Sequence, residues 1–264
     1  MNKAPLMFIS HGSPMVALES SQATSQLNDV GQYFQHAKAV VVMSAHWLTA
    51  DIEITSASKP NLIYDFYGFP DELYQVQYPV QGSKAIAEML MTQINRITSL
   101  PASVKLHESR GLDHGVWTPL IHLLPNPTIP VVQLSLPYKQ EFLEDWQNYI
   151  ELGRICRELR NYGIAFIGSG DITHNLREAR QAAQPDCQAA KFELWVRQQV
   201  QHRDWQALRD APSLYGNFTH YHPTPEHYLP LLFMAGAVAA EDELTLLQNP
   251  LEMGVISRES YLFS

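Results

Sequence analysis

The chain has 264 residues, which suits one large domain or two small ones, and its hydrophobic fraction of 45% is ordinary for a globular protein. A formal net charge of −9 without a cluster of lysine and arginine argues against nucleic acid and anionic membranes as partners. The two cysteines form no CxxC pair, which excludes a disulfide framework and a sulfur-ligated zinc site and makes a reducing cytoplasm the expected location.

The chain begins without the apolar core of a signal peptide, and no stretch approaches the ~20 apolar residues of a membrane span. Short apolar runs that predict strands lie near residues 6–10, 39–45, 51–56, 130–136 and 164–169. Longer runs with helical spacing lie near 20–36, 83–97, 116–124, 139–161, 175–183, 188–209, 225–237 and 241–247. This alternation predicts an α/β fold over residues 1–264, with a largely parallel or mixed sheet between helices.

The segment 57–82 is long for a simple connection and rich in aromatic residues. Long ordered loops of this kind are often binding loops, so Tyr67 and Phe69 are candidates for substrate contact. Trp47, beside a candidate site histidine, is a third. Rings that fill the core under a surface loop are an equally good interpretation of the segment.

Four of the eleven histidines lie where a metal or active site is expected. His11 and His46 come at or after the ends of predicted strands, and His174 follows a third strand through Gly168-Ser169-Gly170. The carboxyl ends of parallel strands share one edge of a sheet, where ligands bind in open α/β folds. His227 stands at the start of a predicted helix. Imidazoles gathered from distant segments suit zinc or iron.

The third ligand is open between His227 and its neighbour Glu226, since an acid in a first helical turn also has a structural role. A set of two histidines and one carboxylate is typical of non-haem Fe(II), whereas three histidines with an open position also suit zinc. His114, between Gly111 and Gly115, is a candidate acid–base group or substrate contact, or else a turn histidine bonded to Asp113.

Several motifs together resemble a known family. They are His11-Gly12-Ser13-Pro14-Met15, Ser44-Ala45-His46-Trp47, Asp65-Phe66-Tyr67-Gly68-Phe69-Pro70, Gly111-Leu112-Asp113-His114-Gly115, Val132-Gln133-Leu134-Ser135, Thr173-His174-Asn175-Leu176-Arg177 and Pro223-Thr224-Pro225-Glu226-His227-Tyr228-Leu229-Pro230. Nearly end to end, the chain resembles the 4,5-DOPA dioxygenase extradiol-like proteins. These belong to the class III extradiol ring-cleavage dioxygenases, of the protocatechuate 4,5-dioxygenase β-subunit type.

The resemblance implies one divalent metal, Zn²⁺ or Fe²⁺, held by His11, His46 and His227. It places His174 beside the metal as a base or fourth ligand, and His114 as the other histidine of the pocket. Glu226 stays open, because the type case uses a glutamate. The implied reaction is opening of a small aromatic diol by O₂.

Two other functions remain open at this point. Three histidines and an open position would also serve a zinc-dependent hydrolase. A binding protein for a small molecule or peptide would keep the pocket without turnover, because one fold can host unrelated functions.

Overall fold

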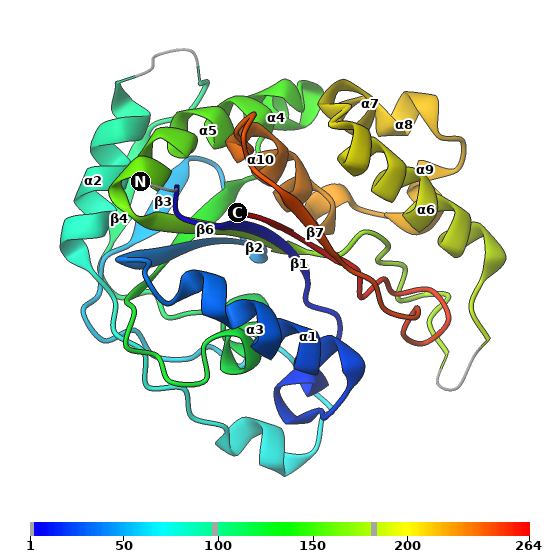
Figure 1. Cartoon of the computed structure of the whole chain (residues 1–264), viewed down its shortest axis with the longest axis horizontal. Coiled ribbons are helices and arrows are strands. Elements are labelled where there is room, and N and C mark those ends of the chain that lie inside the picture. The colour runs from blue at the N-terminus through cyan, green and yellow to red at the C-terminus, as the bar shows by residue number, and fades with distance from the viewer. Residues whose placement is uncertain (1–2, 97–99, 181–183) are drawn as a thin grey trace.

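A mixed eight-stranded sheet with helices on both faces forms a single α/β domain in the computed structural model, which describes residues 3–96, 100–180 and 184–264 (Figure 1). The strands follow the order β4-β3-β5-β2-β6-β1-β8-β7. Their bounds are β1 Leu6–Ser10, β2 Ala39–Thr49, β3 Ile52–Thr55, β4 Val104–His107, β5 Val131–Pro137, β6 Ile164–Gly170, β7 Leu244–Leu247 and β8 Ser260–Phe263. The central strands β5, β2, β6 and β1 are parallel, so their carboxyl ends lie at one edge.

The outer strands explain the mixed character of the sheet. Strands β3 and β4 pair in parallel with each other, but β3 meets β5 antiparallel. On the other side, β8 is antiparallel to both β1 and β7.

Helices α1 and α3 cover one face of the sheet, and α2, α4, α5 and α10 cover the other, with α6 to α9 beyond them (Figure 1). The bounds are α1 Gln22–Val30, α2 Lys84–Asn95, α3 His114–Leu123, α4 Gln140–Glu144, α5 Gln147–Arg157, α6 Cys187–His202, α7 Trp205–Arg209, α8 Ala211–Leu214, α9 Phe218–Tyr221 and α10 Leu229–Ala237. Short 3₁₀ helices span Pro14–Leu18, Gly31–Phe34, Asp71–Gln75, Glu158–Tyr162 and Pro225–His227. None of the described helices is both long and apolar enough to cross a membrane.

Each face of the sheet has its own apolar core. In β1, Leu6 and Phe8 join one buried cluster, whereas Met7 and Ile9 join the other. Side chains of a strand alternate between faces, and a strand covered on both sides therefore reads as a continuous apolar run. This is why the central strands are visible in the sequence.

Two predicted helices are wrong. The run near 241–247 contains β7, which pairs with β8, and four apolar or β-branched residues alone do not reveal this partner strand. In the run near 175–183, residues 176–178 form a turn and 175, 179 and 180 are irregular, while 181–183 lie outside the described residues. The Asn175 carboxamide oxygen accepts a hydrogen bond from the Arg177 N–H at 3.1 Å, and such a local bond competes with a helix.

Two long predicted helices are divided in the structure. The run near 188–209 becomes α6 and α7 because Arg203 takes a left-handed conformation, with φ of 57°, and Asp204 caps α7. The run near 139–161 becomes α4, α5 and a 3₁₀ turn. Strands β4 and β8 were not predicted.

Candidate metal centre

His11 leaves the sheet at the carboxyl end of β1. Its backbone N–H donates to the Gly170 carbonyl at 3.0 Å, which continues the pairing with β6. Gly12 then turns the chain away with φ of 62°, a conformation that favours glycine. The Gly12 N–H donates to Asp171 Oδ1 at 2.9 Å, so the turn after His11 is held from the neighbouring strand.

His46 lies within β2 rather than after it, because this strand continues to Thr49. The pairing of β2 with β5 shifts register between Met43 and Leu48. An irregularity of this kind bends the strand and redirects a side chain, which here brings His46 to the cavity. Trp47, the next residue, was expected to contact substrate, but it does not line the cavity and packs under the Arg110 guanidinium at 4.7 Å.

His174 and His227 come from the loop after β6 and from the 3₁₀ turn Pro225–His227 before α10. The Asp171 N–H donates to the His227 carbonyl at 2.9 Å, which joins the two segments. At Gly170 a Cβ would stand 2.1 Å from that same carbonyl oxygen, so only glycine allows this approach. The two imidazole rings consequently stack, with centroids 3.5 Å apart and planes inclined by 9°.

The predicted ligands His11, His46 and His227 converge. One ring nitrogen from each lies within 4.8 Å of the others, and the Nε2 atoms of His11 and His46 are 3.0 Å apart. The Nε2 atom of His227 is buried and has no hydrogen-bond partner among the described residues. Three imidazoles from distant segments therefore face one point.

Hydrogen bonds at Nδ1 leave Nε2 as the free nitrogen of two of these rings. His11 Nδ1 is 2.9 Å from Ser169 Oγ, whose own hydroxyl hydrogen goes to the Gly115 carbonyl, so the Nδ1–H donates. His227 Nδ1 is 3.1 Å from Glu226 Oε1. Partners of this kind fix the tautomer of metal-binding histidines. Glu226 thus contacts the far side of the His227 ring.

Burial keeps these imidazoles neutral. Loss of solvent, followed by the proximity of the other histidines, lowers the pKa of His11 and His227 well below the usual value, and that of His46 to about 3. Neutral imidazoles that turn bare nitrogens to one point are good donors for Zn²⁺ or Fe²⁺. The cluster therefore fits a divalent cation.

Two further histidines lie beside this cluster. Burial lowers the pKa of His174 to about 4, and its ring lines the cavity. His114, at the start of α3, has its Nδ1 2.9 Å from Asp65 Oδ1, and its backbone N–H donates to the same oxygen at 3.0 Å. Burial acts to raise the pKa of Asp65, but the hydrogen bonds and charge of His114 and His46 bring it below the usual value.

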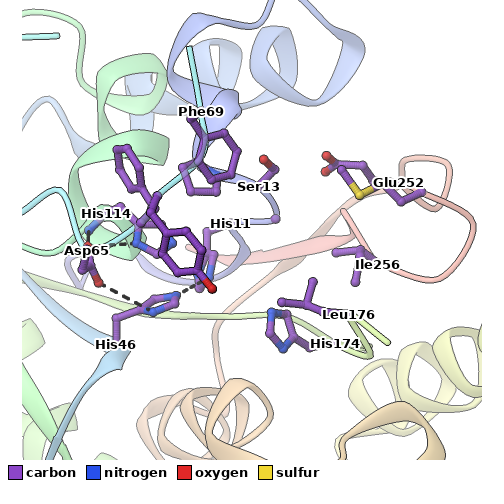
Figure 2. Close-up of a pocket in the computed structure, with 15 residues that line it drawn as sticks. His11, Ser13, His46, Asp65, Phe69, His114, His174, Leu176, Glu252 and Ile256 are labelled. Carbon is purple, nitrogen blue, oxygen red and sulfur yellow. Dashed lines mark hydrogen bonds and ion pairs between the residues drawn. The ribbon is translucent and has the colours of Figure 1, made fainter. Parts of the chain in front are cut away.

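A cavity of about 430 Å³ opens onto the histidines (Figure 2). Its lining comprises His11, Gly12, Ser13, Pro14, His46, Asp65, Phe66, Tyr67, Phe69, His114, His174, Leu176, Glu252, Met253 and Ile256. His11, His46 and His114 lie on one side, and Glu252 and Ile256 lie on the other (Figure 2).

The aromatic segment divides between the cavity and the core. Phe66, Tyr67 and Phe69 line the cavity, and Tyr67 is 92% exposed at its rim. Tyr78 belongs to the core, and Tyr64 packs edge-on against Trp117 with centroids 5.5 Å apart.

Three carboxylates of the site were not predicted from the sequence. Asp65 orients His114, Asp171 lies beside His11, and Glu252 lines the cavity. Asp65 stands inside one of the quoted motifs and Asp171 directly follows Gly168-Ser169-Gly170, so their positions were visible although their contacts were not. Glu252 follows the predicted helix that is in fact β7, in a region where no signal pointed to the site. His222 is buried, with Nε2 2.6 Å from the Ile172 carbonyl.

Comparison with known proteins gives consistent matches over the whole chain. Residues 5–259 match the family model of the catalytic LigB subunit of aromatic ring-opening dioxygenase. The 4,5-DOPA dioxygenase extradiol of Escherichia coli K12 is 35% identical over 97% of this chain and 93% of its own length. That of Beta vulgaris is 33% identical over 97% and 95%. The crystal structure of uncharacterized protein JW3007 from Escherichia coli K12 superposes with a TM-score of 0.82 at 31% identity, covering 99% of this chain and all of the other.

Proposed function

Since the chain belongs to the LigB family of extradiol aromatic ring-opening dioxygenases, we propose that it opens a catechol whose side chain carries a protonated amine, with O₂ as the second substrate. The observation that carries this proposal is a cavity lined by four histidines, His11, His46, His114 and His174. A carboxylate, Glu252, lies on the side opposite His11, His46 and His114 (Figure 2). The relatives named for DOPA support the same class of substrate.

The proposed ligands are His11, His46 and His227, because their neutral ring nitrogens converge. A redox-active ion such as Fe²⁺ held there would supply the electron transfer between catechol and O₂ that Zn²⁺ in the same ligands would not. Glu226 is proposed to hold the His227 ring through Nδ1 rather than to serve as the third ligand.

His174 is the proposed base for a catechol hydroxyl. Its lowered pKa keeps the imidazole neutral at pH 7, so that a ring nitrogen is free to accept a proton. Its ring lines the cavity and stacks on His227, and this position next to the histidine cluster supports the proposed role.

His114 is the proposed second proton carrier. Asp65 holds the proton on Nδ1 and leaves Nε2 free to accept a proton and return it. The two histidines flank the metal ligands: the His114 ring is 4.0 Å from that of His46, and His174 is stacked on His227. Protons would therefore move at both sides of the bound ring.

The apolar walls would hold the ring and exclude water. Phe66, Phe69 and Leu176 line the cavity together with Ile256. Tyr67, exposed at the rim, is placed to cover a bound ring.

Glu252 gives the site its proposed preference for an amine. Its Oε2 accepts from Arg258 Nη1 at 2.8 Å, and Glu19 lies 3.4 Å from the same guanidinium. One arginine between two carboxylates leaves a net charge of −1 on this wall. Because the neighbouring walls are apolar, that charge would favour a cationic substituent over an anionic one.

The test is O₂ uptake by protein purified without oxygen and reconstituted with Fe²⁺ or with Zn²⁺. The substrates are L-DOPA, dopamine, catechol and 3-(3,4-dihydroxyphenyl)propionate. We expect one O₂ per ring opened with Fe²⁺ only, and a kcat/KM at least tenfold higher for dopamine than for the propionate. In the Glu252→Gln variant this ratio should fall toward one.

The outcomes separate the two parts of the proposal. Equal use of dopamine and the propionate by the unaltered protein would reject the amine preference and leave ring opening intact. Absence of O₂ uptake with every catechol, in protein that retains Fe²⁺, would reject ring opening of these substrates.

A further inference from the structure

Asp171 follows β6 directly and is completely buried. Its Oδ1 accepts a hydrogen bond from the Gly12 N–H at 2.9 Å, but its Oδ2 has no hydrogen-bond partner among the described residues. Buried oxygens without a partner are rare, because loss of hydration then goes uncompensated. The position of this oxygen therefore requires an explanation.

Oδ2 faces the same point as the proposed ligands. It lies 3.8 Å from His11 Nε2, and a carboxylate oxygen of Asp171 groups with ring nitrogens of His174 and His227 within 4.8 Å. His227 belongs to both this group and the one formed with His11 and His46. The carboxyl group is thus part of the wall around the histidine cluster.

No described lysine or arginine forms an ion pair with Asp171, and the imidazole beside it, His11, is kept neutral by burial. A carboxylate in such surroundings is costly unless a cation is near. Conversely, three neutral imidazoles bring no negative charge to a divalent cation.

We propose that Asp171 supplies the negative charge that the three-histidine set lacks, as a charge partner beside the bound cation. The site would then hold a divalent ion with a net charge of +1, as a set of two histidines and one carboxylate does. This inference rests on the metal centre of the proposed function. The carboxylate that balances the charge of the cation is then Asp171 rather than Glu226. Glu226 contacts Nδ1 of His227, the nitrogen that faces away from the cluster, and is partly exposed.

The test is metal affinity, measured for Zn²⁺ and Co²⁺ by competition with a chromophoric chelator. In Asp171→Asn the amide oxygen can still accept from Gly12 while the charge is lost, and Asp171→Ser keeps a smaller acceptor. We expect both variants to bind either ion about tenfold to a hundredfold more weakly, as is typical when a group supporting metal ligands is replaced. The absorption spectrum of bound Co²⁺ should shift as well.

The matched control is Glu178→Gln, which removes a carboxylate charge from an exposed position of the same loop after β6, outside the cavity lining. It should change affinity less than threefold, because water screens a charge at that position. Unchanged affinity in both Asp171 variants would overturn the inference, as would an equal loss in Glu178→Gln. Failure of both Asp171 variants to fold would assign Asp171 to the fold and overturn it too. If the unaltered protein binds no metal, the metal centre of the proposed function is rejected.

Discussion

At the scale of single residues, the site depends on which nitrogen of each imidazole is free. His11 and His227 have Nδ1 engaged by Ser169 and Glu226, whereas His174 lines the cavity and its ring stacks on that of His227. This difference separates residues suited to holding a cation from one suited to moving a proton. It also explains why neighbouring histidines of one cluster can have different roles.

Replacement of His174 tests this division. We expect His174→Ala to fold and to retain metal, because His11, His46 and His227 remain. Its turnover of catechols should fall by about 10²–10⁴, the usual contribution of a positioned acid–base group. Metal content and O₂ uptake are the two measurements. A variant that no longer binds metal would make His174 a ligand, and unchanged turnover would remove it from the proton path.

Asp65→Asn tests the orientation of His114. An amide cannot stabilise the proton on Nδ1 as a carboxylate does, so we expect kcat to fall about tenfold to a hundredfold. Asp71→Asn, at an exposed acid of the same aromatic segment, is the control and should behave as the unaltered protein. If only KM changed in Asp65→Asn, the carboxylate would be a substrate contact instead.

At the scale of elements, the site depends on how closely α10 approaches β6 and α5. A Cβ on Gly236 would stand 1.8 Å from the Ile150 carbonyl oxygen, and one on Gly153 would stand 1.9 Å from that of Phe233. These glycines let the α5 and α10 backbones touch. Because the turn that carries His227 leads into α10, helix packing and ligand position are linked.

Gly236→Ala should therefore lower the free energy of unfolding by about 1–3 kcal/mol, the usual cost of overpacking, since backbone atoms cannot move aside easily. Thermal unfolding of the metal-free protein measures the effect. Gly216→Ala is the control, because nothing lies within 4 Å of a Cβ there and little change is expected. Equal melting temperatures for both variants would show that the helices can separate at no cost.

The elements also show how far the sequence could be interpreted. All five predicted strands exist, because a strand buried on both faces is apolar throughout. Strands β7 and β8 were missed because each depends on the other across an intervening loop. The site shows the same contrast. The motifs predicted which histidines converge, whereas Glu252 lies in a segment without a motif and reaches the cavity only in the folded chain.

At the scale of the whole molecule, the chain buries many imidazoles in neutral form. Burial is the main cause that lowers the pKa of His46 and His222 to about 3 and that of His174 to about 4. In the unfolded chain a histidine has a pKa of about 6.5. Above that pH neither state takes up a proton. As the pH falls below about 6.5, the histidines of the unfolded chain bind protons, whereas the buried histidines of the native protein do not.

We therefore expect the metal-free protein to lose stability between pH 7.5 and pH 5.5. Each such histidine contributes a slope of at most ~1.4 kcal/mol per pH unit once its unfolded form is protonated. Three buried acids oppose this trend, because burial raises the pKa of Glu193 to about 7 and also raises that of Asp113 and Asp171, so that the native protein binds protons there first. The histidines with a lowered pKa are more numerous, namely His11, His46, His174, His222 and His227, so the net sign is a loss on acidification.

Chemical denaturation at several pH values provides the measurement. His222→Gln should reduce the pH dependence of the free energy of unfolding by the contribution of one histidine. His222 is buried away from the cavity, and a glutamine amide can still donate to the Ile172 carbonyl. Added Zn²⁺ should steepen the slope, since it binds native neutral imidazoles and protons compete for the same nitrogens. Stability that stayed constant or rose toward pH 5.5 would mean that these histidines are not held neutral by the fold.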